Sequence, residues 1–167
     1  MATYIKIASN TVGAGGVASV TFSSIASTYT DLILKFSARN TADSSQGLIT
    51  LNGSATSFTG RRLYGSGSTV SADAGNTTNF NPSSVTASSY TANTFGNGEI
   101  YIPNYAGSNN KIVGIDAVTE NNATTAYGGV FAGLWSNTSA VTSITITANT
   151  GNIAQYSTFT LYGVSNA

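Results

Sequence analysis

The chain of 167 residues contains no cysteine and no histidine. The lack of cysteine excludes disulfide bonds, thiol nucleophiles and thiolate metal sites. The lack of histidine removes the usual catalytic base and the commonest metal ligand. Charge is also scarce, since 7% of the residues are charged, against roughly a quarter in an average soluble protein. Six basic residues balance six acidic ones, so the chain lacks the basic excess that holds phosphates, and we expect no nucleic-acid partner.

Long apolar runs are missing too. None is long enough to cross a bilayer. The opening MATYIKIASN alternates polar and apolar residues, as a strand does, and lacks the apolar segment of a signal peptide. We therefore expect no membrane partner and no N-terminal export signal.

Small polar residues are abundant instead: 25 Thr, 23 Ser, 17 Asn and 18 Gly together make up about half of the chain. Such residues offer hydrogen bonds at a surface but create little electric field. Weak self-repulsion favours association, so we expect a protein that works inside an assembly. The length fits one domain, which we place at residues 1–167, with residues 1–16 acting as a strand or arm in contacts with neighbours.

Polar and apolar residues alternate along most of the chain, as in β-strands that bury one face. Leu32, Leu34 and Phe36 share one face of a predicted strand, and Ile144 and Ile146 share a face of another. No helical period persists for three turns. The pattern predicts an all-β protein of about nine strands, arranged as a two-sheet antiparallel sandwich with a jelly-roll-like topology.

The middle of the chain breaks this pattern. Residues 66–93 are mostly Ser, Thr, Asn, Gly and Ala, and we expect a long excursion here with one short strand. Disorder is the alternative for such a composition. An ordered excursion of this length suits a Greek-key or jelly-roll crossover better than a simple meander.

Aromatic residues alternate with glycines in the predicted strand YGGVFAGLWS, residues 127–136. Tyr127, Phe131 and Trp135 share strand parity with Gly129 and Gly133, which predicts rings lying across bare backbone in a packed sheet. We expect Trp135 in the core. The nine tyrosines of the chain suit either sugar binding or protein interfaces, because aromatic side chains anchor both.

Paired carboxylates are the main candidates for catalysis or calcium binding. Asp116 and Glu120 lie four residues apart, and Glu99 is a possible third member. Asp116 has the parity of Ile112 and can point inward or toward a cleft. The alternative is a set of solvated or turn-capping acids, with Asp116 paired to a basic residue. Because the acids are few and isolated, we expect no enzyme, no catalytic residues, no metal site and no cofactor.

Arg61 and Arg62 are the only adjacent charges. Arginine donors suit interfaces, so we expect at least one of the two to contact a neighbouring subunit, together with Tyr64. The alternative is a strand with one arginine exposed and the other paired within the chain. Tyr4 and Lys6 complete the predicted interface, because an N-terminal strand with an open edge can add to a neighbour's sheet.

Several segments together resemble small virion structural proteins of tailed bacteriophages, including cyanophages. The resemblance extends from Tyr4 to Val164 and is weakest over residues 66–91. The segments that carry it are SSIASTYTDLILKFSARN, RRLYGSGS, NTFGNGEIYIPNYAGSNNK, TENNATTAYGGVFAGLWSNTSAVTSITI and STFTLYGV.

Proteins of this kind are described as capsid decoration (cement) proteins, head fibres or tail-fibre-like proteins. The resemblance implies a structural protein on the outer capsid surface of a virion. Its expected partners are the major capsid protein and copies of itself, as a homotrimer. The alternative is a receptor- or glycan-binding module of a head or tail fibre, whose partner would be a host glycan.

Overall fold

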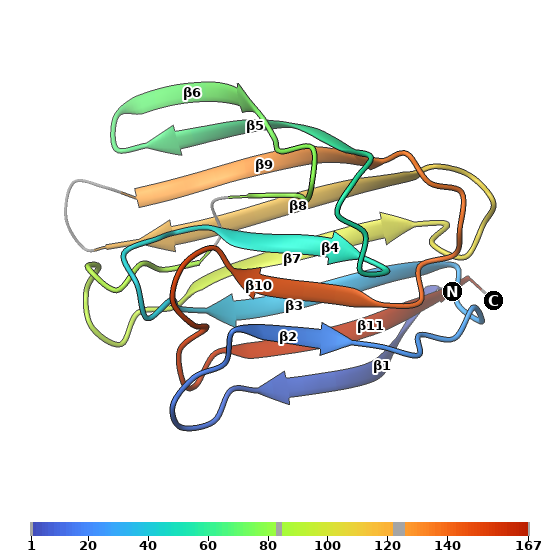
Figure 1. Cartoon of the computed structure of the whole chain (residues 1–167), viewed down its shortest axis with the longest axis horizontal. Helices are drawn as coiled ribbons and strands as arrows, with labels where there is room; N and C mark the ends of the chain where they lie inside the picture. The colour runs from blue at the N-terminus through green and yellow to red at the C-terminus, as the bar shows by residue number, and fades with distance from the viewer. Residues whose placement is uncertain (1, 83–84, 122–125, 167) are drawn as a thin grey trace.

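The structure is a computed structural model that describes residues 2–82, 85–121 and 126–166, and the regular secondary structure within them is entirely β (Figure 1). No described segment forms a helix that could span a bilayer. The all-β prediction is confirmed. The eleven strands are β1 (Ala2–Thr11), β2 (Ser19–Phe22), β3 (Asp31–Ala38), β4 (Gly47–Leu51), β5 (Phe58–Ser66), β6 (Thr69–Ala74), β7 (Gly96–Pro103), β8 (Lys111–Glu120), β9 (Ala126–Trp135), β10 (Ile144–Ala148) and β11 (Thr158–Asn166).

Eleven strands exceed the expected nine chiefly because of β5. Its glycines and its two adjacent arginines obscure the alternation of apolar and polar residues. The short strand expected in the middle excursion is β6. The disorder alternative for that excursion is not supported, because most of it has a defined path through bridges and hydrogen bonds.

The strands form two antiparallel sheets, which confirms the sandwich prediction. The large sheet has eight strands in the order β1-β11-β3-β7-β8-β9-β5-β6, and the small sheet has three in the order β2-β10-β4. In Figure 1 the small sheet lies in front of β11, β3 and β7, while β8, β9, β5 and β6 extend the large sheet beyond it. The extended part of the large sheet therefore needs another cover.

The connections step between the two sheets as the crossover expectation requires. The chain passes from the large to the small sheet three times, into β2, β4 and β10, and returns each time to the large sheet, into β3, β5 and β11. Phe80 makes an isolated antiparallel bridge to Ile49 on the open side of β4. This order agrees with the jelly-roll interpretation for half of the molecule, whereas β8, β9, β5 and β6 depart from an eight-stranded jelly roll.

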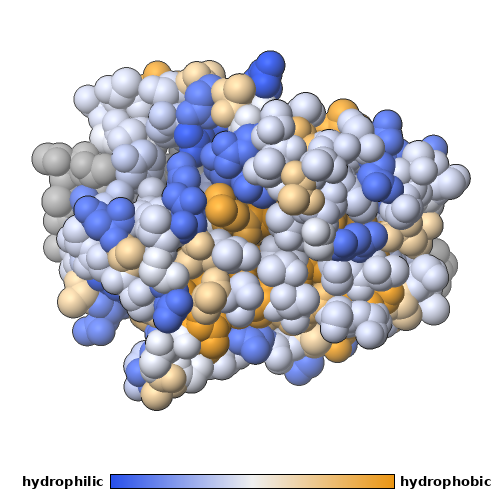
Figure 2. Space-filling model, viewed as in Figure 1, coloured by the Kyte–Doolittle hydropathy of each residue, from blue (hydrophilic) through white to orange (hydrophobic). Residues whose placement is uncertain are grey.

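Apolar side chains from both sheets fill the space between them. Ile144 and Ile146 of β10 are buried, as their alternation with serine and threonine predicts. Phe36 of β3 stacks on Phe159 of β11, with ring centroids 6.2 Å apart. Figure 2 shows that the solvent side over the small sheet is mostly of intermediate hydropathy, with scattered hydrophilic side chains. The hydroxyl-rich faces thus meet solvent, and the isoleucines form the core.

The middle excursion covers the inner face of the extended large sheet. Phe80 packs edge-on against Phe58 and Phe131, with ring centroids 4.9 Å and 5.9 Å away. Trp135 is fully buried and stacks on Phe58. A Cβ atom built on Gly133 would lie 2.6 Å from the Phe80 ring. The predictions of a core Trp135 and of rings against bare backbone are both confirmed.

Arg39 fixes the second half of this excursion. Its guanidinium donates hydrogen bonds of 2.9–3.0 Å to the backbone carbonyls of Ser88, Tyr90, Thr91 and Thr94. The backbone of Arg39 also forms a parallel bridge with Thr86. One side chain therefore satisfies a curved row of carbonyl groups that no sheet pairs.

The two ends of the chain lie together. β1 pairs antiparallel with β11, from Ala2 opposite Asn166 to Thr11 opposite Thr158, and Figure 1 shows both termini at one end of the sandwich. Residues 2–11 of the expected arm are therefore a strand built into the large sheet. Met1, the first residue of that arm, lies outside the described residues.

Candidate interaction surface

The predicted interface residues lie near opposite edges of the large sheet. Tyr4 and Lys6 belong to β1, which forms one edge, and both are exposed. Arg61, Arg62 and Tyr64 belong to β5, next to β6 at the other edge. The fold therefore brings the five residues together as two separate groups.

The β1 edge presents large side chains on the outermost strand of the large sheet. In the described structure β1 pairs with β11 alone. Tyr4 is 57% exposed and Ile5 is 42% exposed, and the Tyr4 ring lies edge-on to Tyr162 of β11 at 6.4 Å. An edge of this kind can accept a strand from another chain, because no strand of the described sheet lies on its outer side.

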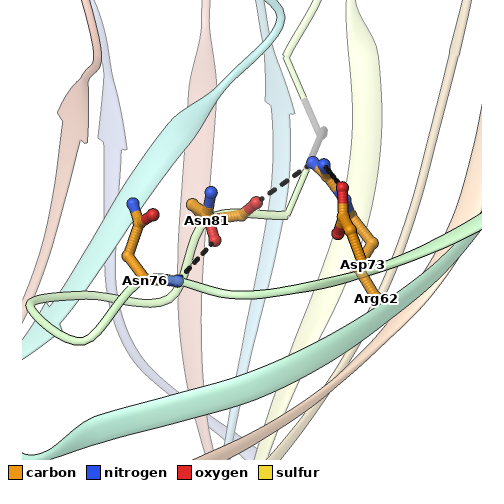
Figure 3. A network of polar contacts seen from close by, with 4 residues as sticks. All are labelled: Arg62, Asp73, Asn76 and Asn81. Carbon is orange, nitrogen blue, oxygen red and sulfur yellow. Dashed lines mark hydrogen bonds and ion pairs between the residues drawn. The ribbon is translucent and has the colours of Figure 1, made fainter.

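Arg62 serves an internal network. Its Nε donates to Asp73 Oδ1 at 3.0 Å and its Nη2 to Asp73 Oδ2 at 2.5 Å, while Nη1 donates to the backbone carbonyl of Asn81 at 3.5 Å. The Asn81 side chain in turn accepts a hydrogen bond from the backbone of Asn76 (Figure 3). This bidentate pair ties β5 to β6 and to the middle excursion.

Replacing Arg62 with alanine is expected to lower the free energy of unfolding by about 2 kcal/mol, because the partly buried Asp73 carboxylate loses its partner. Arg61→Ala is the matched control, since Arg61 is exposed and its described hydrogen bond is to the neighbouring Gly60 carbonyl. We expect it to change the same free energy by less than about 0.5 kcal/mol. Urea unfolding of both variants in dilute protein, where association does not contribute to the stability, measures the difference, and equal effects would contradict the internal role of Arg62.

Tyr64 is half-buried on the inner face, near other aromatic side chains. The Arg62 guanidinium lies 4.6 Å from the Tyr64 ring centroid, and the Tyr64 and Tyr127 rings are 6.1 Å apart. Burial of the Tyr90 side chain, and to a smaller extent its contacts with Tyr127, raise the pKa of Tyr90 to about 12. The pocket that Tyr64 and Tyr127 line with Pro82 has room for about one water molecule, so its size does not fit a sugar ring.

The acidic candidates all face outward. Asp116 and Glu120 are exposed on β8, so the expectation that Asp116 can point inward is wrong. The register places Glu99 of β7 directly opposite Asp116, and Lys35 forms an ion pair with Glu99 at 3.0 Å. The cluster lies on an open sheet face, where water screens the charges. This arrangement fits the solvated alternative, although Lys35 pairs with Glu99 and not with Asp116.

Two charged side chains are buried among the described residues, and both order the turn between β7 and β8. Asp31 accepts hydrogen bonds from the Asn104 backbone and the Tyr101 hydroxyl, each at 2.9 Å. Lys111 donates to the carbonyls of Gly107 and Asn109. Burial lowers the pKa of Lys111. These contacts give both charges a structural role.

An exposed apolar surface, which sequence reasoning missed, covers the outward side of β5 to β9. Six large side chains on these neighbouring strands are between 40% and 75% exposed. Their outward parity follows from the register, in which Leu63 lies opposite Val130 and Tyr101 opposite Gly114. We call this surface the apolar outer face. Its large members are Leu63, Val70, Tyr101, Ile112, Val118 and Val130.

A signal for this surface is present in the sequence. Within Lys111–Val118, KIVGIDAV, apolar residues occupy both parities of the strand, as is typical of strands covered on both faces. Val113 and Ile115 are buried toward the core, whereas Ile112 and Val118 are exposed. β8 therefore has the composition of a strand that is covered on both faces. In the described structure, however, only its inner face is covered.

Comparisons of the chain with protein-family models, with curated proteins and with solved structures found no match. The described residues contain no group of three acidic side chains that could hold a metal ion. Two exposed surfaces, the β1 edge and the apolar outer face, are the candidates for binding a partner.

Proposed function

We propose that the protein is a structural component of a tailed-bacteriophage particle, a decoration protein that binds the outside of the assembled head and stabilises it. The observation that carries this proposal is the open edge of β1 with its exposed Tyr4, Ile5 and Lys6. Such an edge can extend a sheet of the major capsid protein by backbone hydrogen bonds. The resemblance of the sequence to virion proteins supports the same role.

The physical character of the surface suits this task. A neutral, hydroxyl-rich protein binds through many weak contacts and avoids the desolvation cost of buried charge. A protein that binds the assembled shell in preference to loose subunits stabilises the shell by mass action. Because few charges take part, attachment should weaken only slightly at high salt.

Particles that lack the protein are expected to assemble but to release their DNA at a lower temperature than complete particles. Added purified protein should bind to saturation, at a copy number set by the shell lattice, and restore the heat resistance. The measurement is DNA release during heating, with bound protein quantified on purified particles. Particles that keep their heat resistance but fail to adsorb to host cells would instead favour the receptor- or glycan-binding fibre module.

Paired variants locate the contact. Tyr4→Ser combined with Lys6→Ser should reduce occupancy of the particle about tenfold, because the two exposed side chains supply part of the contacts of the edge, and a loss of about 1.4 kcal/mol weakens binding tenfold. Tyr156→Ser is the matched control, since Tyr156 is a 69% exposed tyrosine in a loop outside the β1 edge. Equal occupancy for the edge variant and the control would remove the β1 edge from the proposed contact.

A further inference from the structure

The apolar outer face is large for a surface that meets water. It spans β6, β5, β9, β8 and β7, and five strands spaced about 4.8 Å apart and about 8 residues long give a flat area of about 500 Å². Side-chain relief makes the accessible area larger than the flat area. Standard protein interfaces bury about 800 Å² on each partner, and the flat area alone is more than half of that value.

Small residues hollow the centre of this face. Gly114 of β8 lies opposite Ala132 of β9, which in turn lies opposite Arg61 of β5. Two shallow hollows meet here, with Ile112 and Ala132 lining both. A Cβ atom built on Gly114 would meet nothing within 4 Å. The protruding Ile112 and Val130 stand beside these hollows, so the face carries both knobs and holes.

The charges on the face are arranged for a second copy. Arg61 lies on one side of β9, opposite Ala132, and Asp116 lies on the other side, opposite Val130. No hydrogen bond or ion pair reaches the Asp116 carboxylate from the described residues. We consider a two-fold axis that lies in the plane of the face, crosses β9 between Ala132 and Val130, and runs perpendicular to the line from Arg61 to Asp116. Rotation about this axis exchanges the positions of Arg61 and Asp116 between the two copies. Each Arg61 then meets the Asp116 of the other copy.

We propose that the apolar outer face binds a second copy of this chain, face to face, about that two-fold axis. The contact buries the six large apolar side chains of the face in both copies. It also pairs Arg61 of each copy with Asp116 of the other, as an isologous interface requires. This dimer differs from the homotrimer that the resemblance implies, and the molar mass of the purified chain distinguishes the two. The proposal does not depend on where the protein lies in a particle, because it concerns the purified chain.

The test measures the molar mass of the full-length protein by sedimentation over a range of concentrations. The wild type should reach the mass of two chains, and Val130→Lys should weaken self-association at least about tenfold by placing charge in the buried centre. Gly114→Lys should act alike, and its open surroundings leave the fold intact. Ser9→Lys is the matched control, because Ser9 is exposed on β1 of the same sheet.

A charge exchange tests the reciprocal pair. Arg61→Asp alone and Asp116→Arg alone should each weaken the dimer, because like charges then face each other. The double variant should restore it. A wild type that stays monomeric, a trimer, or a dimer unaffected by both lysine variants overturns the proposal. If the two single variants and the double variant all dimerise as strongly as the wild type, the two-fold pairing of Arg61 with Asp116 is wrong. If a monomeric protein binds to the particle, the dimer proposal is wrong and the proposed function is still supported.

Discussion

Replacing Gly133 with valine is expected to lower the free energy of unfolding by about 3 kcal/mol, the upper part of the usual range for overpacked cores. Gly133 is buried in β9, and an added Cβ would lie 2.6 Å from the Phe80 ring and 3.1 Å from the Phe131 ring. Neither ring can withdraw, because both are buried between the large sheet and the middle excursion. The valine would therefore separate the excursion from the sheet.

Gly114→Val provides the matched control. Gly114 lies in the neighbouring strand β8, but its side-chain direction points to solvent with nothing within 4 Å. A β-branched residue suits an exposed strand position, so this variant should unfold at the same urea concentration as the wild type or a higher one. Urea unfolding of both variants under dilute conditions measures the difference. Similar losses for both would contradict the packing of Phe80 on Gly133.

Replacing Arg39 with alanine is expected to cost about 3 kcal/mol of unfolding free energy, because hydrogen bonds from a charged donor contribute more than neutral ones and the freed carbonyls lose their partner. Four backbone carbonyls between Ser88 and Thr94 accept bonds from this guanidinium. The loss should be local, so limited proteolysis should cut the variant within residues 88–94 before it cuts elsewhere.

Arg39→Lys distinguishes shape from charge. A lysine keeps the positive charge but cannot match the planar fork of donors that reaches several carbonyls at once. We expect it to recover less than half of the stability lost in Arg39→Ala. Full recovery would mean that charge alone holds the excursion, and proteolysis spread evenly over the chain would show that Arg39 supports the whole sandwich.

The sequence by itself determined the all-β fold class of the protein and which side chains share a face of each strand. The alternation in Leu32–Phe36 and around Ile144 and Ile146 indicated β-strands, and these isoleucines are buried as expected. The same periodicity placed Phe131 and Trp135 on the face of Gly133. This information is local, because strand geometry alone sends successive side chains to opposite faces.

Only the tertiary structure decided which faces are covered. Asp116 and Ile112 have the same parity, and nothing in the sequence says whether that parity meets the core or solvent. Likewise, Arg61 and Arg62 are adjacent, and only the pairing of β5 with β6 gives Arg62 its partner Asp73.

The physical reason is that sheet order depends on pairings between segments far apart in the chain. β1 pairs with β11, and β9 pairs with β5 rather than with β10. A period of two residues shows which side chains share a face, but it does not show which segment of the chain covers that face. The neutral hydroxyl-rich surface followed from the composition. The open β1 edge and the apolar outer face, in contrast, depend on how the strands pair in the large sheet.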